Sequence, residues 1–413
     1  MASQRSSRRL SPRPARRSNP STRLTGSLLG AALLLGAQAA SAQMITYGPI
    51  IGRGQSGDSM IVKWGTQNSG DSTKVSYRVK GAASFTSVTG TSAKDHELVL
   101  KGLTLGQVYE YNVTSGTQTS MTYSFSTCPL PGRPMDMVFY GDSRSDPSAH
   151  ARVLAQVAKQ SPEMVMESGD IAPIGSYDQY LMEFFPTAKS LVATTAFMAA
   201  PGNHDAPLGE AGMKDNYARV FPTPRADGAA WKPYYAFTCG NASFLSLNSN
   251  DIGNAEQLAF IKDQLDRAKK NPDVDHVLVW FHHAPYSPGS HGDNGTIQSQ
   301  WVPLFNAPDS KVTAVFSGHD HIYARMDDSS PVFYVVSGGA GAGLYSDTAR
   351  SKATKVKSKS AYNFVSVHLA GPLFSAVAYD DSGTELDRFT LTRSPLPPTD
   401  GGLGPRDLSV VRA

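Results

Sequence analysis

The sequence has no internal repeat, no Gly-x-Ser-x-Gly motif and little net charge, and these absences exclude several classes of protein. Without the Gly-x-Ser-x-Gly motif, a serine hydrolase built on a nucleophile elbow is disfavoured. The net charge is +3, but residues 1–42 hold seven arginines and no lysine, aspartate or glutamate. The rest of the chain has 31 basic and 35 acidic side chains, so its charge gives no reason to expect a nucleic-acid partner.

Long apolar runs are also scarce. One such run, Leu24 to Ala40, follows the arginine-rich start and ends at Ala40-Ser41-Ala42. A positive segment, a short apolar run and an Ala-x-Ala site are typical of an export signal, so we predict that residues 1–42 are removed and that the mature protein is periplasmic or extracellular, without a membrane attachment. Retention of the run as a membrane anchor is the alternative, although 17 residues barely span a bilayer.

Cysteine is rare as well, with only Cys128 and Cys239 present, 111 residues apart. An exported protein with two cysteines forms one disulfide or keeps two thiols, and the sequence leaves both possibilities open.

The chain has 413 residues, of which 40% are hydrophobic and 18% charged, which indicates a globular protein of roughly two to three domains. Residues 44–127 alternate apolar and polar side chains in short runs, which predicts an all-β domain. Residues 128–134 contain three prolines and form a predicted linker. Strand-like runs then alternate with helical patterns over residues 135–393, which predicts an α/β domain, and residues 394–413 are a predicted flexible tail.

Five apolar runs in the α/β part each end in a short polar motif. The motifs, in chain order, are Gly141-Asp142-Ser143-Arg144, Ser168-Gly169-Asp170, Gly202-Asn203-His204-Asp205, His282-His283 and Gly318-His319-Asp320-His321. Ligands of open α/β sheets gather at the carboxyl ends of strands, so the five motifs are expected to converge on one site.

The side chains of these motifs suit a pair of metal ions. Imidazole and carboxylate groups bind iron, zinc or manganese, and a glycine before the ligand lets the backbone turn tightly. Two metals about 3.5 to 4 Å apart hold the attacking and leaving oxygens of a displacement at phosphorus. The predicted reaction is therefore hydrolysis of a phosphate ester.

The ordered motifs resemble those of the calcineurin-like metallophosphoesterases. Residues Ile322-Tyr323-Ala324-Arg325, the later Gly338-Gly339-Ala340-Gly341 and the preceding β-domain are similar to the purple acid phosphatase branch. The β-domain, with Trp64 early and Tyr109 and Tyr111 near its end, resembles a fibronectin type III sandwich. The resemblance implies two mixed β-sheets flanked by helices in the second domain.

The resemblance also implies a role for each motif residue. Asp142 and His321 would bind the first metal, Asp170 would bridge, and Asn203, His282 and His319 would bind the second. His204, paired with Asp205, would protonate the leaving oxygen, with Asn203 and Arg144 also near the substrate. Water activated by the two ions would attack the phosphate.

Two positions depart from the family pattern. Arg144 stands where many relatives have a histidine ligand, and Pro173 stands where purple acid phosphatases have the tyrosine responsible for their colour. A guanidinium group has only donors, so Arg144 is predicted to clamp the substrate phosphate; an outward orientation toward Asp146 is the alternative. We do not expect a purple protein, and we give little weight to Tyr177 or Tyr180 as replacements, because their spacing from Asp170 is wrong.

Other histidines have simpler interpretations. A strand alternates its faces, so one of His282 and His283 should point at the metals, and the spacing to Pro285 favours His282. We interpret His291 as a solvent-exposed loop residue.

The leading interpretation is an exported metal-dependent phosphoesterase that hydrolyses small-molecule phosphate monoesters or diesters. The alternative is a non-catalytic binding or adhesion protein with a degenerate phosphoesterase domain, an alternative favoured by Arg144 and Pro173.

Overall fold

The computed structural model describes residues 45–348 and 350–393, so the predicted export signal and C-terminal tail lie outside the described residues. Among the residues that are described, no helix has both the length and the apolar character needed to cross a bilayer.

The N-terminal part is built from a three-stranded and a five-stranded antiparallel sheet. Its strands are β1 (Ile45–Arg53), β2 (Met60–Thr66), β3 (Asp71–Val79), β4 (Thr86–Ala93), β5 (Asp95–Leu100), β6 (Val108–Ser115), β7 (Gln118–Thr119) and β8 (Tyr123–Ser126). The first sheet has the order β1-β2-β5, and the second has the order β4-β3-β6-β7 with β8 also paired to β6. Trp64, Tyr111 and Phe125 fill the core of this β-domain, and Nε1 of Trp64 donates a hydrogen bond to Oγ of Ser115 over 2.9 Å.

The second part contains two mixed sheets. The six-stranded sheet has the order β11-β10-β9-β19-β20-β21, and the seven-stranded sheet has the order β12-β13-β14-β15-β17-β16-β18. The strands of the first sheet are β9 (Met135–Tyr140), β10 (Met164–Glu167), β11 (Ala196–Ala199), β19 (Asn363–Ala370), β20 (Leu373–Asp380) and β21 (Glu385–Thr392). Those of the second are β12 (Tyr235–Cys239), β13 (Ala242–Ser246), β14 (His276–His283), β15 (Val312–Gly318), β16 (Tyr323–Asp327), β17 (Phe333–Ser337) and β18 (Thr354–Lys359).

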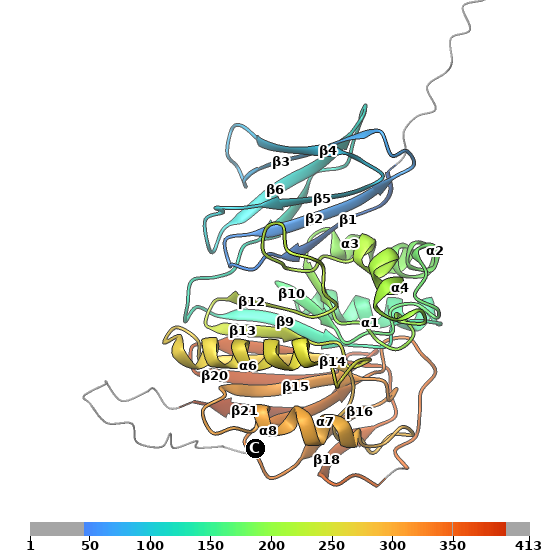
Figure 1. Ribbon diagram of the computed structural model, residues 1–413, viewed down its shortest axis with the longest axis vertical. Coiled ribbons are helices and arrows are strands. Elements are labelled where there is room, and N and C mark those ends of the chain that lie inside the picture. Colours follow the sequence, from blue (N-terminus) through green and yellow to red (C-terminus); the bar gives the residue numbers. More distant parts are fainter. Residues whose placement is uncertain (1–44, 349, 394–413) are drawn as a thin grey trace, which may run out of the picture. The chain divides into compact units, whose positions relative to one another are not determined.

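Helices cover the outer faces of both sheets (Figure 1). They are α1 (Pro147–Lys159), α2 (Tyr177–Gln179), the π-helix η1 (Tyr180–Phe184), α3 (Phe185–Val192), α4 (Gly209–Asp215), α5 (Tyr217–Val220), α6 (Ala255–Lys270), α7 (Gly295–Gln300) and α8 (Val302–Phe305). α1 and α3 pack on the six-stranded sheet, whereas α6, α7 and α8 pack on the seven-stranded sheet. Asp146 begins α1 by accepting hydrogen bonds from the N–H groups of Ser148 and Ala149.

The inner faces of the two sheets pack against each other through large aromatic side chains. Phe139 of β9 stacks on Phe316 of β15 with ring centroids 3.7 Å apart, and Trp280 of β14 contacts Phe139 edge-on. The predicted α/β domain with two mixed sheets and flanking helices is thus confirmed. Because β9 and β15 face each other, the motifs that follow them end close together.

Buried polar contacts join the β-domain to the α/β part. The Arg53 guanidinium donates to the carbonyl oxygens of Ser126 (2.7 Å) and Glu163 (3.2 Å). Asp95 accepts hydrogen bonds from Arg219 (2.7 and 2.9 Å) and from the hydroxyl of Tyr177 (2.6 Å).

A covalent link also joins the segment after β8 to the end of β12. Cys128 and Cys239 form a disulfide, which decides between the two possibilities that the sequence left open.

The buried histidine of α1 predicts how stability depends on pH. Burial lowers the pKa of His150 to about 3. Between that value and about 6.5 the unfolded chain binds a proton that the folded chain does not, so stability is lost as pH falls through this interval. The free energy of unfolding of the wild type should fall between pH 7 and pH 4. We expect this fall to be about 2 to 3 kcal/mol smaller in His150→Leu, as measured by urea denaturation.

His368→Leu is the matched control, because the side chain of His368 is partly exposed. An equal pH dependence of wild type and His150→Leu would contradict the buried neutral imidazole.

Candidate metal centre

Three predicted metal ligands lie at strand ends in the left-handed region of backbone conformation. Asp142 follows β9 with φ 61°, Asp170 follows β10 with φ 59°, and His319 follows β15 with φ 68°. Residues other than glycine rarely adopt this conformation, and those that do are concentrated at functional sites. The backbone N–H of His319 donates to Oδ2 of Asp142 over 2.9 Å, so the ends of the two sheets meet here.

Two glycines allow these segments to approach one another. A Cβ atom at Gly202 would lie 2.2 Å from Oδ1 of Asp170, and a Cβ atom at Gly318 would lie 2.3 Å from Oδ2 of Asp142. The sequence suggested that glycines in these motifs serve tight turns. At these two positions the structure gives close packing against a carboxylate as the reason.

The imidazole of His282 is buried at the middle of the cluster. Its Nδ1 donates to the carbonyl oxygen of Ser168 over 3.0 Å, which leaves a lone pair on Nε2. This Nε2 lies 3.0 Å from Oδ1 of Asn203, 3.1 Å from Nδ1 of His319 and 3.3 Å from Oδ1 of Asp170. Two oxygens that only accept hydrogen bonds therefore face a nitrogen lone pair, and a cation among them would remove the resulting repulsion.

A second group of acceptors lies beside the first. Nδ1 of His321 donates to the carbonyl oxygen of Gly343 over 2.7 Å, and its Nε2 lies 3.5 Å from Oδ1 of Asp142. That Oδ1 is buried without a hydrogen-bond partner among the described residues. Asp142, Asp170 and His282 each offer one ligand atom, and these atoms lie within 4.8 Å of one another. The six side chains named from the sequence thus lie together, and their donor set fits iron, zinc or manganese.

The electrostatics of the cluster also favour a cation. Burial, with a further contribution from Asp170, raises the pKa of Asp142 to about 6. Burial and the neighbouring histidines lower the pKa of His319 to about 2, and burial holds the pKa of His282 well below its usual value. Both imidazoles are therefore neutral and able to coordinate, while the negative charge of the carboxylates lacks full compensation.

The predicted pairing of Asp205 with His204 is wrong. Asp205 is fully buried, and its oxygens accept hydrogen bonds from the backbone of Asp170 (2.7 Å), Gly202 (2.8 Å) and Ile171 (3.3 Å) and from the hydroxyl of Tyr180 (2.9 Å). Buried backbone N–H groups need an acceptor, and the Asp205 carboxylate accepts from those of both loops. Asp205 therefore positions the loop of the ligand Asp170 rather than the imidazole.

His204 has a different partner. Its Nδ1 lies 2.6 Å from the carbonyl oxygen of Pro173, so Nδ1 carries the proton that this acceptor requires. Nε2 lies 3.8 Å from Oδ2 of Asp170, at the border of the cluster, and the side chain is about one-third exposed. His204 therefore presents Nε2 to anything bound over the metal centre.

Arg144 also reaches the cluster. Its Nε donates to Oδ2 of Asp170 over 3.2 Å, and one Nη donates to Oγ of Ser145 over 3.3 Å. The alternative orientation, outward to Asp146, is wrong, because the Asp146 carboxylate instead begins α1. The guanidinium group lies beside a carboxylate of the metal centre, with its side chain mostly buried.

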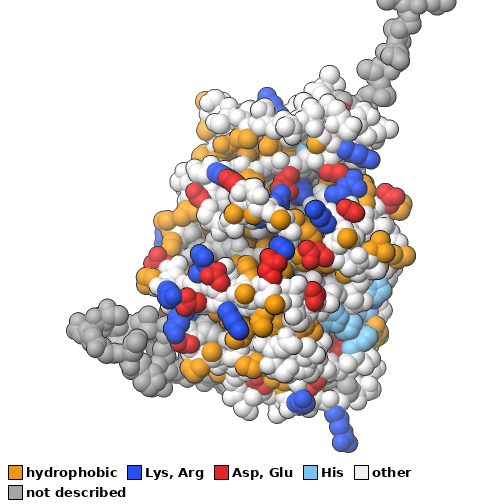
Figure 2. All heavy atoms as spheres, viewed as in Figure 1, with side chains coloured by type: hydrophobic (Ala, Val, Ile, Leu, Met, Phe, Trp, Pro, Cys, Tyr) orange, Lys and Arg blue, Asp and Glu red, His pale blue; other side chains and the backbone are white. Residues whose placement is uncertain are grey.

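The other histidines near the cluster contact it from outside. His283 pairs through Nδ1 with Oγ of Ser249 at 2.9 Å. His291 is exposed, as predicted, but its ring also stacks on that of His319 with centroids 3.8 Å apart. Figure 2 shows histidine side chains gathered at one edge of the molecular surface.

Neither tyrosine considered as a replacement ligand lies in the cluster. The hydroxyl of Tyr177 donates to Asp95, and that of Tyr180 donates to Asp205. Pro173 thus accepts a hydrogen bond from His204 with its carbonyl oxygen and offers no side-chain ligand to a metal.

The sequence interpretation missed two neighbours of the site. Glu167 is fully buried at the end of β10, accepts a hydrogen bond from Oγ of Ser143 over 2.5 Å, and has a pKa that burial raises well above its usual value. The sequence did carry a signal for Glu167, because it is an acidic residue at the end of an otherwise apolar strand. Tyr345 stacks on His321 with ring centroids 4.1 Å apart, and the sequence carried no signal for it beyond the preceding glycines.

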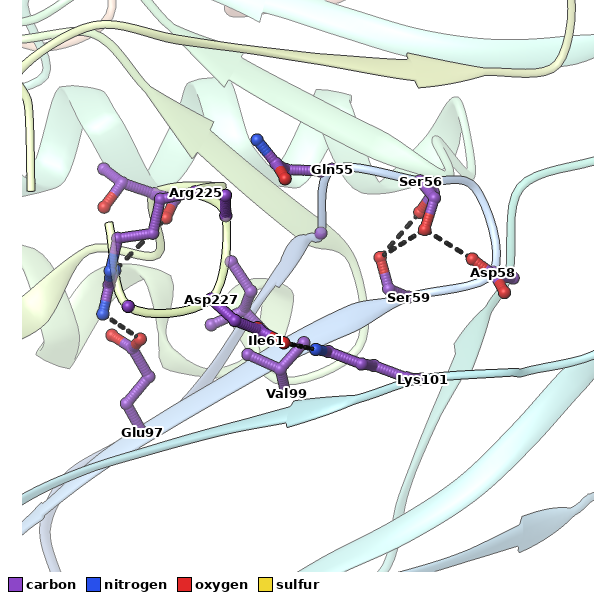
Figure 3. A pocket seen from close by; sticks show the side chains of 14 residues that line it. Gln55, Ser56, Asp58, Ser59, Ile61, Glu97, Val99, Lys101, Arg225 and Asp227 are labelled. Atoms are coloured by element: carbon purple, nitrogen blue, oxygen red, sulfur yellow. Dashed lines mark hydrogen bonds and ion pairs between the residues drawn. The ribbon is translucent and has the colours of Figure 1, made fainter. Parts of the chain in front are cut away.

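A separate hollow of about 400 Å³ lies between the β-domain and residues 223–228 (Figure 3). Its cations are already paired, Arg225 with Glu97 at 2.5 Å and Lys101 with Asp227. The hollow contains no imidazole and none of the predicted ligands. It is therefore not the metal centre.

The geometry predicts that His282 holds metal and that its neighbour His283 does not. We expect His282→Ala to lose at least one bound ion per chain, because Nε2 of His282 is the atom on which the acceptors converge. Metal content of purified protein, measured by inductively coupled plasma mass spectrometry, checks this. The matched control His283→Ala should keep the content of the wild type, and an equal loss in both variants would contradict the assignment.

The site can be compared with known proteins now that its geometry is described. The Calcineurin-like phosphoesterase family matches residues 136–323, and the N-terminal domain family of purple acid phosphatases matches residues 49–127. Tartrate-resistant acid phosphatase type 5 of Rattus norvegicus is 26% identical over 332 residues, which cover 69% of this chain and 98% of the rat protein. The human protein of the same name is 31% identical over 176 residues, which cover 38% of this chain and 51% of the human one.

Solved structures show the same fold. A purple acid phosphatase from seeds of yellow lupin (Lupinus luteus) has a TM-score of 0.71 and 18% identity, and the match covers 84% of this chain and 74% of the lupin chain. The structure of PhoD has a TM-score of 0.60 and 14% identity, over 83% of this chain and 92% of that one. The chain therefore carries a calcineurin-like phosphoesterase domain preceded by an N-terminal domain of the purple acid phosphatase type, and this combination indicates a phosphate-ester hydrolase.

Proposed function

We propose that this chain is an exported metal-dependent phosphatase that hydrolyses small-molecule phosphate monoesters or diesters at a two-metal centre. The observation that supports it most is the convergence of unprotonated ligand atoms on Nε2 of His282 and Oδ1 of Asp142, bordered by Arg144 and His204. Export rests on the pattern of residues 1–42, which lie outside the described residues.

The side chains divide between two ions in the way that the family resemblance implies. Asp142 and His321 would hold one ion, Asn203, His282 and His319 would hold the other, and Asp170 lies between the two groups. When bound, such ions lower the pKa of water and stabilise the charge that develops on phosphate oxygens.

His204 is placed to supply a proton. The bond from its Nδ1 to the Pro173 carbonyl fixes the ring, so a second proton would reside on Nε2, the atom that faces the cluster. In that position His204 protonates the leaving oxygen of the ester, without the help of Asp205.

Arg144 is placed to bind the phosphate. Its Nε is engaged by Asp170, which sets the plane of the guanidinium group next to the metal centre. A phosphate would lie between this cation and the ions and would relieve their mutual repulsion. Arg144 and Pro173 leave the first ion without the side-chain ligand that many relatives have there.

We further propose that the β-domain has the fibronectin type III arrangement. The hydroxyl of Tyr109 accepts a hydrogen bond from the backbone N–H of Thr104 over 2.9 Å, five residues upstream. A tyrosine that bonds back to the preceding backbone is a recurring feature of such sandwiches.

Metal analysis combined with two chromogenic esters tests the proposed function. We expect about two ions per chain and turnover of p-nitrophenyl phosphate, bis-p-nitrophenyl phosphate or both, because the centre suits displacement at phosphorus. Two ions per chain with no turnover of either ester would instead support the binding or adhesion protein.

Substitution of Arg144 tests its contact with phosphate. We expect Arg144→Ala to lower kcat/KM for p-nitrophenyl phosphate by about tenfold to a hundredfold and to weaken inhibition by inorganic phosphate, since a charge-assisted hydrogen bond is worth about 1.5 to 3 kcal/mol. Arg152→Ala is the control, because Arg152 pairs with Asp381 on the surface. Unchanged turnover and unchanged phosphate inhibition in Arg144→Ala would reject the clamp.

A further inference from the structure

A buried acid lies behind the metal centre, at the end of β10. Glu167 is fully buried, and its Oε1 accepts a hydrogen bond from the hydroxyl of Ser143 over 2.5 Å. Its Oε2 has no hydrogen-bond partner among the described residues. Burial of a carboxyl group is unfavourable unless hydrogen bonds replace its lost hydration. The bond to Ser143 is therefore the contact through which Glu167 can act on the site.

Ser143 stands between two residues of the site. Asp142 on one side is a predicted metal ligand, and Arg144 on the other side is the residue proposed to bind phosphate. The backbone N–H of Arg144 donates to the carbonyl oxygen of Asp170 over 3.3 Å, which is at the long end of the range for such bonds. The hydroxyl of Ser143 provides a shorter attachment next to Arg144, to β10 through Glu167.

The turn that contains Ser143 has an unusual backbone and close neighbours. Asp142 and Ser145 both lie in the left-handed region, with φ 61° and 75°. Residues other than glycine persist in this region where the surrounding structure holds them. On the other side of the turn, a Cβ atom at Gly341 would lie 2.3 Å from the carbonyl oxygen of Ser143. Ser143 is thus held between Glu167 and the backbone of Gly341.

The position of this turn determines where the guanidinium group of Arg144 lies. The Arg144 side chain is mostly buried, and its Nε reaches Oδ2 of Asp170 at 3.2 Å. Arginine has several rotatable bonds, so a group that binds substrate at its tip is placed well only when its backbone is fixed. A displacement of about 1 Å in a substrate-positioning group can cost about a hundredfold in rate. A contact that fixes the backbone at Ser143 therefore bears directly on phosphate binding.

We propose that Glu167 is a positioning residue: through the hydroxyl of Ser143 it fixes the turn that carries Arg144, so that the guanidinium group is in place before phosphate binds. This inference rests on the proposed function, because it takes Arg144 to contact phosphate. A purely structural role for Glu167 has a different consequence. Its loss would then lower the free energy of unfolding and leave the phosphate affinity of the folded, metal-loaded protein unchanged.

A double-mutant cycle on phosphate binding tests the proposal without turnover. Inorganic phosphate is titrated calorimetrically into metal-loaded wild type, Ser143→Ala, Arg144→Ala and the double variant, and the metal content of each is measured. We expect Ser143→Ala to weaken phosphate binding about threefold to tenfold when Arg144 is present, and less than about twofold when residue 144 is alanine, because the hydroxyl acts through Arg144. Equal weakening in both backgrounds, or no weakening in either, would overturn the proposal.

Variants of Glu167 assign the effect to the hydrogen bond. Glu167→Ala is expected to weaken phosphate binding as much as Ser143→Ala, whereas Glu167→Gln keeps an oxygen that accepts from the hydroxyl and should stay within about twofold of wild type. Equal weakening in Glu167→Gln and Glu167→Ala would count against the proposal. If Glu167→Ala does not fold, Ser143→Ala, which removes a single oxygen atom, still decides the question.

Ser310→Ala is the matched control for Ser143→Ala. The hydroxyl of Ser310 is also buried and donates to the carbonyl oxygen of Phe305 over 2.6 Å. Ser310 precedes β15, at the end of that strand opposite to His319. We expect the phosphate affinity of this variant to equal that of wild type, and a loss as large as that of Ser143→Ala would show that any buried serine has this effect.

Turnover of p-nitrophenyl phosphate separates failure of this inference from failure of the proposed function. In wild type we expect hydrolysis, and in Ser143→Ala a kcat/KM that is lower by about threefold to tenfold. If no ester is hydrolysed but phosphate binds and the cycle shows coupling between Ser143 and Arg144, the proposed function fails and the positioning role stands. If the ester is hydrolysed and the effects of the two substitutions on phosphate binding are additive, the function stands and this inference fails.

Discussion

The central constraint on this molecule is that its fold holds several unprotonated nitrogen and oxygen atoms close together, where they repel one another. Nε2 of His282 faces the oxygens of Asn203 and Asp170 at 3.0 and 3.3 Å, and Oδ1 of Asp142 is buried without a hydrogen-bond partner among the described side chains and backbone. In water each of these groups would be solvated separately. Folding brings them together, and a cation bound among them would make the arrangement favourable.

The frame that holds the ligands is itself made of buried hydrogen bonds. Asp205 binds the backbone of Asp170 and Gly202, and Tyr180 holds Asp205 in turn. Burial and the nearby charge of Asp170 raise the pKa of Asp205 to about 7, so this carboxyl group is also sensitive to charge at the centre. Glu167, behind Ser143, adds another buried acid to the same region. The left-handed backbone at Asp142, at Asp170 and at His319 is sustained by this surrounding network.

Arg144 and Pro173 lie at the border of the centre rather than in it. Arg144, at a position where the family resemblance implies a histidine ligand, is a cation whose Nε contacts Asp170, and Pro173 contributes its carbonyl oxygen, which orients His204. The loops outside these two residues expose Ile174 and Leu208. The predicted ligands lie at strand ends, whereas the residues around them lie in loops. The loops can therefore differ without a change in the ligands themselves.

Much of the architecture and the approximate site followed from local patterns in the sequence. Alternation of side chains predicted the strands of the first domain, and the apolar runs that end in Gly-Asp, Asn-His and His-Asp-His predicted which strand ends meet, because each signal is contained in a few consecutive residues. Only the tertiary structure decided what depends on distant partners. It showed that Asp205 binds the Asp170 loop instead of His204, that Cys128 bonds to Cys239, and that Arg144 turns toward Asp170 rather than Asp146. A local motif determines which side chains follow the end of a strand. The partner of a buried charge or thiol is determined by the group that the fold places within about 3 Å of it.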